Sequence, residues 1–113
     1  MITIYHNPRC TKSREGLCEI ETLNQPFTVR KYLEIPFTKS EFEDVIKKLN
    51  IQPIELVRTK ESIWIENYKG KALNDDEIIE IMLKNPKLIE RPIIVNGNKA
   101  IIARPLDKIK EIL

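Results

Sequence analysis

The first third of the chain alternates between two strand-like segments and one helix-length segment, and this order limits the fold more than any other feature of the sequence. Ile2–Tyr5 is short, β-branched and aromatic, which predicts a buried strand, and Phe27–Leu33 predicts a second strand. A helix is expected between them from about Thr11 to Leu23, although Gly16 weakens it by about 1 kcal/mol relative to alanine. Its inner face would carry three apolar side chains: Leu17, Ile20 and Leu23. A helical crossover between two strands implies a right-handed parallel βαβ unit, and hence an α/β domain.

Two signatures of helix N-termini predict that the middle of the chain is helical. Thr38 and Glu41 have the spacing of a capping box, and an apolar face follows them at helical spacing. That face consists of Phe42, Val45, Ile46 and Leu49. Asn74 and Glu77 repeat the cap signature ahead of a second helix, which Pro86 ends.

The connection between these two helices carries weaker signals. Pro53 can begin a short helix in the segment PIELVR, and Trp64 is expected to be a packing residue. We expect residues 1–113 to form a single domain, in which a helical subdomain at about residues 36–88 connects the second strand to the third.

The C-terminal segment PIIVNGNKAIIARP predicts a β-hairpin followed by a helix. Asn96 and Gly97 between two apolar runs are a strong hairpin signal. Pro105 is placed where the first turn of a last helix tolerates a missing N–H group. The inner face of that helix would consist of Leu106, Ile109 and Leu113. The full order is therefore β-α-β, a helical block, and then β-β-α.

Composition limits the class of protein. The chain has 19 basic and 17 acidic side chains and a net charge of +2, which is too mild to suggest nucleic-acid or membrane binding by bulk charge. No apolar run approaches the ~20 residues of a membrane span, and the first residues lack the pattern of a signal peptide. We therefore expect a cytoplasmic protein. Its two cysteines, Cys10 and Cys18, provide no disulfide framework, and no His/Cys cluster accompanies them as a metal site.

Cys10 is the residue with the clearest chemical potential. It stands directly before the expected helix, where unpaired backbone N–H groups and the positive end of the helix dipole favour a thiolate. Cationic neighbours can lower the pKa of such a cysteine from ~8.5 to between ~3.5 and ~7.5. The nearest cations in the sequence are Arg9, Lys12 and Arg14, with His6 upstream. Ser13 can donate a hydrogen bond back to the sulfur. The alternative is that Cys10 is a small buried hydrophobe.

Neither cysteine has an obvious internal partner. If the segment is helical, Cys10 and Cys18 lie about 12 Å apart, whereas a disulfide tolerates at most ~7 Å. Cys18 also falls away from the apolar stripe, so we expect a partly exposed, non-resolving thiol. A dithiol oxidoreductase would need cysteine in place of Ser13, and a phosphatase loop of the form C-x5-R would need arginine in place of Gly16. The second thiol must then come from outside the chain.

Three arginines stand where predicted elements begin or end. Arg58 would end the PIELVR helix, while Arg91 and Arg104 each precede a proline and a new element. Such positions often build sites in α/β domains, and the planar fork of arginine suits tetrahedral oxyanions. The alternative is that all three are solvated surface charges.

Together these features resemble the ArsC-type arsenate reductases that use glutathione and glutaredoxin. The resemblance extends from Ile2 to Leu113, and the chain is most similar to a shorter branch of the family. It is also related to the Spx-like proteins. The motifs that carry the resemblance are IYHNPRCTKSRE, YLEIP, ELVRTKE, NPKLIERPIIV and ARP. It implies a thioredoxin-like fold with a mixed four-stranded sheet and a helical insertion between the second and third strands.

The resemblance also implies roles for individual residues. Cys10 matches the nucleophile, and His6 and Ser13 match positions that lower the pKa of its thiol. Arg58, Arg91 and Arg104 match the arginines that bind the arsenic oxyanion. Pro92 matches the cis-proline of thioredoxin-like folds. No metal or bound cofactor is implied, and glutathione and glutaredoxin act as co-substrates.

Two other functions fit the same residues. The chain could reduce glutathione mixed disulfides, with a substrate other than arsenate. It could also be a transcriptional regulator that binds RNA polymerase, like the Spx-like proteins. Many of those regulators carry a C-x-x-C switch, of which Ser13 replaces the second cysteine here.

Overall fold

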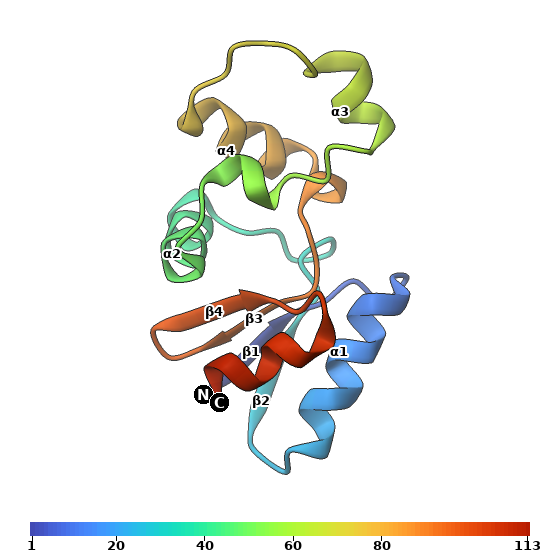
Figure 1. Ribbon diagram of the computed structural model, residues 1–113, viewed down its shortest axis with the longest axis vertical. Helices are drawn as coiled ribbons and strands as arrows, with labels where there is room; N and C mark the ends of the chain where they lie inside the picture. Colours follow the sequence, from blue (N-terminus) through green and yellow to red (C-terminus); the bar gives the residue numbers. More distant parts are fainter. The chain divides into compact units, whose positions relative to one another are not determined.

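A computed structural model describes residues 1–113 and contains one mixed four-stranded sheet (Figure 1). The strands are β1 (Ile2–Tyr5), β2 (Phe27–Arg30), β3 (Ile93–Asn96) and β4 (Lys99–Ile102). Their order in the sheet is β2-β1-β3-β4. β1 pairs in parallel with β2 and antiparallel with β3, and β4 pairs antiparallel with β3. The α/β class and the mixed sheet predicted above are therefore confirmed.

The structure contains four α-helices and three 3-10 helices. The α-helices are α1 (Thr11–Thr22), α2 (Lys39–Leu49), α3 (Ser62–Asn67) and α4 (Asp75–Lys84). The 3-10 helices are η1 (Pro53–Leu56), η2 (Pro86–Leu88) and η3 (Leu106–Ile112). The chain divides into two compact units. We call Met1–Pro36 with Arg91–Leu113 the sheet unit, and Phe37–Glu90 the helical unit.

An apolar core of the sheet unit lies on the face of the sheet that α1 and η3 cover. Ile2 and Ile4 of β1 lie two residues apart and so point to the same face, and Ile94 of β3 pairs with Ile4. The core consists of Ile2, Ile4, Ile20, Ile94, Ala103, Ile109 and Ile112. Leu17 and Leu23 pack against its edge, so the predicted stripe of α1 is confirmed with Ile20 as its fully buried member.

β2 is shorter than the predicted strand, which extended to Leu33. Its parallel partner β1 ends at Tyr5 opposite Arg30, and the N–H of His6 donates to the Arg30 carbonyl at 2.8 Å. Beyond that bond the chain turns, because the Lys31 carbonyl accepts from the backbone N–H groups of Glu34 (3.0 Å) and Ile35 (2.9 Å). The apolar residues after Arg30 therefore have no strand to pair with.

The C-terminal hairpin and helix form, with two changes in detail. The two residues between β3 and β4 are Gly97 and Asn98, and Gly97 has φ +63°, as the first central position of a type II′ turn requires. The last helix is a 3-10 helix with three residues per turn, so its inner face is spaced by three. Ile109 and Ile112 are therefore buried, and the predicted Leu113 is 52% exposed.

The helical unit follows the predicted caps. Capping boxes begin α2 at Thr38 with Glu41 and α4 at Asn74 with Glu77. Trp64 is buried, with its ring 5.6 Å from that of Tyr68, so the packing role predicted for it is confirmed. The Lys39 ammonium lies 3.0 Å from both Asp76 and Glu80 and joins the start of α2 to α4.

The predicted PIELVR helix ends two residues early in this unit. η1 stops at Leu56 because Val57 forms an antiparallel bridge with Ile89. Arg58 consequently lies beyond the bridge and does not end a helix.

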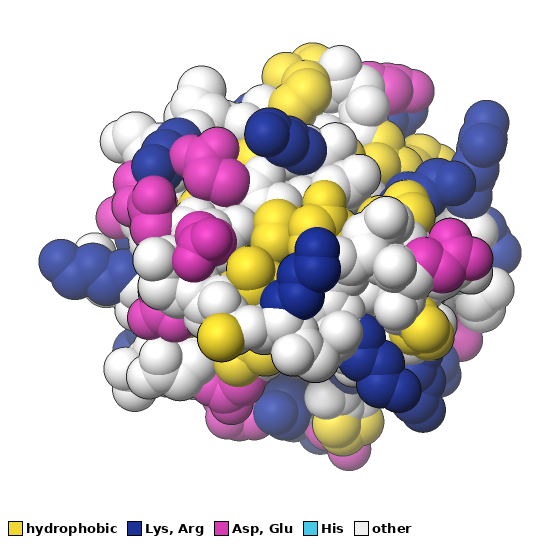
Figure 2. All heavy atoms as spheres, turned by 90° about the horizontal axis from the view of Figure 1, so that it is seen from above, with side chains coloured by type: hydrophobic (Ala, Val, Ile, Leu, Met, Phe, Trp, Pro, Cys, Tyr) yellow, Lys and Arg dark blue, Asp and Glu magenta, His cyan; other side chains and the backbone are white.

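Basic, acidic and apolar side chains are interspersed over the face drawn in Figure 2. None of the helices combines the length and the apolar character that crossing a membrane demands.

Gly16 allows α1 to approach the loop before β3 closely. A Cβ atom on Gly16 would lie 2.8 Å from Cγ of Pro92, closer than carbon atoms can approach. The glycine that weakens α1 in isolation therefore permits its packing in the folded protein.

We predict that Gly16→Ala destabilises the protein by about 1–2 kcal/mol, because the overlap with Pro92 outweighs the better helix propensity of alanine. Urea unfolding compares it with Glu21→Ala, an exposed position of the same helix. An unchanged or raised unfolding free energy for Gly16→Ala would show that the contact is not tight.

Candidate active site

Cys10 occupies the N-cap position of α1, at the end of a tight turn. It has extended backbone angles (φ −99°, ψ 123°), and its carbonyl accepts the first helical hydrogen bond, from Arg14 N–H at 3.0 Å. The N–H of Cys10 donates to the Asn7 carbonyl at 3.0 Å, which closes the turn. The Arg14 guanidinium donates to the Pro8 carbonyl at 2.8 Å and fastens the turn to the helix. The thiol is free and only 8% exposed.

His6 and Ser13 form a buried polar pair beside this turn. Nδ1 of His6 lies 2.8 Å from Oγ of Ser13, and the backbone N–H of Asn7 donates to the same oxygen at 2.9 Å. Burial lowers the pKa of His6, and the positive charges of Lys31 and Arg14 lower it further, while Ser13 opposes the shift. These effects favour the neutral form of the imidazole. The imidazole forms its hydrogen bond with Ser13 and not with the sulfur of Cys10.

The pKa of the Cys10 thiol is lowered although the side chain is buried. Burial on its own raises this pKa, because it removes water from the thiolate. Hydrogen bonds from the backbone N–H of Ser13 and the Arg91 guanidinium, with the positive charge of Arg91, outweigh burial. The backbone N–H of Lys12 adds a smaller contribution. Ser13 thus acts on the sulfur through its peptide N–H, and its hydroxyl acts on His6.

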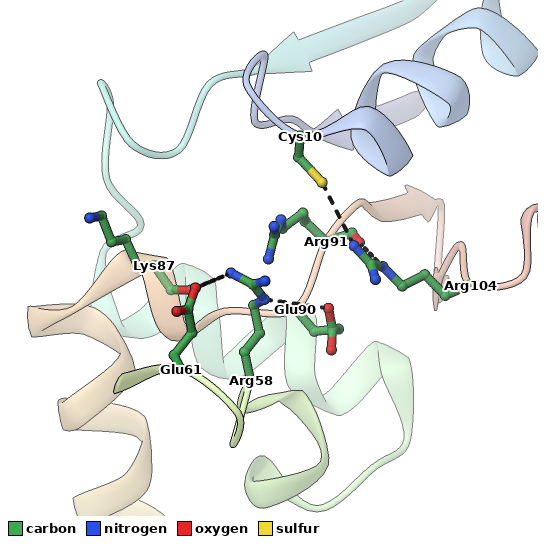
Figure 3. Close-up of polar contacts among 7 residues, drawn as sticks. All are labelled: Cys10, Arg58, Glu61, Lys87, Glu90, Arg91 and Arg104. Carbon is green, nitrogen blue, oxygen red and sulfur yellow. Dashed lines mark hydrogen bonds and ion pairs between the residues drawn. The ribbon is translucent and has the colours of Figure 1, made fainter. Parts of the chain in front are cut away.

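Arg91 and Arg104 come from the two ends of the β3–β4 hairpin. Nη2 of Arg104 contacts Sγ of Cys10 at 3.7 Å, and its Nε donates to the Arg91 carbonyl at 2.7 Å (Figure 3). Nε and Nη1 of Arg91 are buried and have no hydrogen-bond partner. The peptide bonds Arg91–Pro92 and Arg104–Pro105 are both cis, which confirms the cis-proline implied at Pro92.

Arg58 lies in the helical unit, among acidic and carbonyl groups of that unit. Its Nη1 donates to Glu61 at 2.6 Å and to the Lys87 carbonyl at 3.3 Å, and its Nε is 3.9 Å from Glu90 (Figure 3). Its charge is therefore balanced by carboxylates of its own unit. Within the sheet unit the structure brings together five of the six predicted site residues: His6, Cys10, Ser13, Arg91 and Arg104.

The groups that hold the turn do not show in the sequence pattern. Arg14, expected as a charge near the sulfur, donates instead to the Pro8 carbonyl and to Thr11 Oγ1. The N–H of Asn7, which holds Ser13, was not considered, although Asn-Pro before a helix is a known turn signal. Cys18 is exposed, as predicted. No group of three or more His, Cys, Asp or Glu side chains converges anywhere in the protein.

The mixed sheet and a lowered-pKa cysteine at the start of its first helix define a thioredoxin-like protein with a thiol site. The sequence profile of the ArsC family matches residues 5–112, and the chain belongs to this family.

Three similar proteins illustrate the relationship. The Escherichia coli protein YfgD, described as uncharacterised, is 40% identical, and the match covers 99% of this chain and 96% of that protein. The arsenate reductase of Haemophilus influenzae is 36% identical over 99% of this chain and 98% of its own. The structure of an arsenate reductase from Vibrio cholerae has a TM-score of 0.93 at 38% identity, covering 99% and 97% of the two chains.

We predict that Arg91→Gln raises the pKa of Cys10, because it removes a hydrogen bond and a positive charge from the thiolate. The measurement is a titration of thiolate ultraviolet absorbance in a Cys18→Ser background, where Cys10 is the only thiol. Lys99→Gln, an equal loss of charge at an exposed position of β4, is the control and should leave the midpoint unchanged. A midpoint that stays in place in Arg91→Gln would contradict this assignment.

Ser13→Ala should separate the two roles of Ser13. It leaves the His6 imidazole and the Asn7 N–H without a partner, so we expect a loss of about 1–3 kcal/mol in unfolding free energy. It retains the backbone N–H that faces the sulfur, so the thiol midpoint should move less than in Arg91→Gln. Urea unfolding and the same titration measure both quantities, and a large midpoint shift without loss of stability would reverse the assignment.

Proposed function

We propose that this protein reduces arsenate to arsenite, with Cys10 as the nucleophile and glutathione and glutaredoxin as external thiol donors. The observation that carries the proposal is Arg91, whose Nε and Nη1 are buried without an acceptor while the same guanidinium favours the Cys10 thiolate. A buried donor left unpaired costs about 1–3 kcal/mol, and more when it is charged. An oxyanion bound beside the sulfur would supply the missing acceptor.

The chemistry of the arginines and the names of relatives support arsenate as that oxyanion. A guanidinium presents parallel N–H groups that match two oxygens of a tetrahedral oxyanion. Arg91 and Arg104 both lie at the sulfur, so they would offset the charge of substrate and thiolate together. Relatives that this chain matches along nearly its whole length are named arsenate reductases. A role for Arg58 in binding the oxyanion stays a prediction from the resemblance.

In the first step the Cys10 thiolate attacks arsenic. An S–As bond forms, one oxygen of arsenate leaves as water after protonation, and arsenic stays As(V). The two arginines stabilise the negative charge on the remaining oxygens as the bond forms. The peptide N–H groups of Lys12 and Ser13 hold the sulfur at the end of α1. The His6–Ser13 pair fixes the turn from which Cys10 attacks.

In the second step the thiolate of glutathione attacks the sulfur of Cys10. An S–S bond forms, the S–As bond breaks, and its electron pair reduces As(V) to As(III), which leaves as arsenite. Cys10 is then a mixed disulfide with glutathione. Glutaredoxin attacks the glutathione sulfur and releases Cys10 as a thiol. Both cysteines are free, which suits the reducing cytoplasm in which this thiol system operates.

We predict that Cys10→Ser abolishes arsenate reduction and that Cys18→Ser leaves it within about twofold of the wild type. Serine lacks the thiolate, whereas Cys18 is exposed on α1 and takes part in no step. The assay couples the reaction to NADPH oxidation through glutathione, glutaredoxin and glutathione reductase. Loss of turnover in Cys18→Ser would overturn the external-thiol scheme.

The same assay tests the second function, and a measurement of binding to RNA polymerase tests the third. NADPH oxidation with a glutathione mixed disulfide, and none that depends on arsenate, would assign a disulfide reductase. Binding to RNA polymerase without any turnover would assign a regulator.

A further inference from the structure

The sheet unit contains a second feature beside the Cys10 turn, a surface hollow of about 480 Å³. This volume is within the range of ~300–1,000 Å³ that small-molecule sites occupy. Two segments form its walls: the turn that leads into Cys10 and the turn that follows β2. The lining residues are Asn7, Pro8, Arg9, Lys31, Leu33 and Glu34.

Hydrogen bonds to backbone carbonyls hold both walls in place. The first wall is fastened by the Cys10 N–H to the Asn7 carbonyl and by the Arg14 guanidinium to the Pro8 carbonyl. The second is fastened by Arg30, whose Nε and Nη2 donate to the carbonyls of Ile35 (2.9 Å) and Pro36 (2.8 Å). The N–H of His6 donates to the Arg30 carbonyl and joins the two walls. The shape of the hollow is therefore fixed by hydrogen bonds within the sheet unit.

Three charged side chains line the hollow, and none of them makes a hydrogen bond or an ion pair with another side chain. They are Arg9, Lys31 and Glu34, all exposed. Two are cationic and one is anionic. Leu33 is 40% exposed and gives the hollow an apolar surface.

Glutathione carries the complementary set of charges, with two carboxylates and one α-ammonium group. Its backbone has the length of three residues, about 10 Å when extended, with its thiol near the middle. A tripeptide lying along the turn that ends at Cys10 would therefore keep its sulfur within reach of that turn. We propose that this hollow binds the external thiol as a zwitterionic tripeptide, with Arg9 and Lys31 on its carboxylates and Glu34 on its ammonium group. The inference rests on the proposed function, because it supplies the thiol of the second step.

The test uses S-methylglutathione, which has the same charges and cannot react, and Cys10→Ser protein as the parent. Calorimetric titration gives its affinity for the parent and for Arg9→Gln, Lys31→Gln and Glu34→Gln. Each of these substitutions should weaken binding by about two- to fivefold, the range of exposed charged contacts. Lys99→Gln removes an equal charge at the far end of the same unit and should change the affinity by less than about twofold.

A second ligand tests the role of Glu34 by itself. The S-methyl tripeptide with glutaryl in place of γ-glutamyl lacks the ammonium group, so Glu34→Gln should not weaken its binding. Arg9→Gln and Lys31→Gln should weaken it as before. An equal loss for both ligands in Glu34→Gln would overturn the assignment of Glu34.

The binding measurement is independent of arsenate turnover, so the two proposals can fail separately. Absence of saturable binding, or equal losses in Lys99→Gln and Arg9→Gln, would overturn the hollow as the thiol subsite even if arsenate is reduced. Selective losses in a protein without arsenate activity would support the subsite and reject arsenate as the substrate. In the active wild type the same three substitutions should raise the KM for glutathione by about two- to fivefold and leave the KM for arsenate unchanged.

Discussion

The close approach of α1 to Pro92 at Gly16 is the contact on which the site depends. Any side chain at Gly16 would hold the helix away from the loop before β3, because even a Cβ atom would overlap Pro92. Arg91 is the neighbour of Pro92, and Cys10 caps the helix that contains Gly16. The same contact therefore sets how near the guanidinium lies to the sulfur. Electrostatic stabilisation of a thiolate falls off with distance, so the reactivity of Cys10 depends on the packing of one glycine.

A buried polar pair holds the other side of the site. Burying His6 and Ser13 is unfavourable unless each finds a partner, and the two satisfy one another together with the Asn7 N–H. This arrangement fixes the turn before α1 in one conformation. The peptide N–H groups at the start of the helix then point at the sulfur, where they act against the effect of burial. Ser13 thus links the stability of the fold to the reactivity of Cys10. Its hydroxyl stabilises the turn, and its backbone N–H stabilises the thiolate.

Local sequence signals predicted the elements well wherever the signal and its effect lie within a few residues. The capping boxes at Thr38 and Asn74 are satisfied by groups three residues away, and both helices begin as predicted. Errors occurred where a distant partner decides the outcome. β2 ends at Arg30 because β1 ends opposite it, and η1 ends at Leu56 because Val57 pairs with Ile89. The 3-10 helix η3 buries Ile112 and exposes Leu113. The apolar spacing of this segment fits both an α-helix and a 3-10 helix, so the sequence did not predict which of the two forms.

The sequence by itself determined the α/β order, the position of Cys10 at a helix start and the choice of His6, Ser13, Arg91 and Arg104 as its companions. The first two follow from residue type and short-range spacing, and the choice of companions follows from the resemblance to the ArsC family. The tertiary structure decided what each companion does. Arg91 lies at the sulfur and has buried N–H groups without an acceptor, and His6 forms a hydrogen bond with Ser13. Arg14 stabilises the turn by a hydrogen bond to the Pro8 carbonyl. It also decided that Gly16 is a packing requirement. Distances between residues far apart in the chain depend on how elements pack, and short-range spacing does not contain that information.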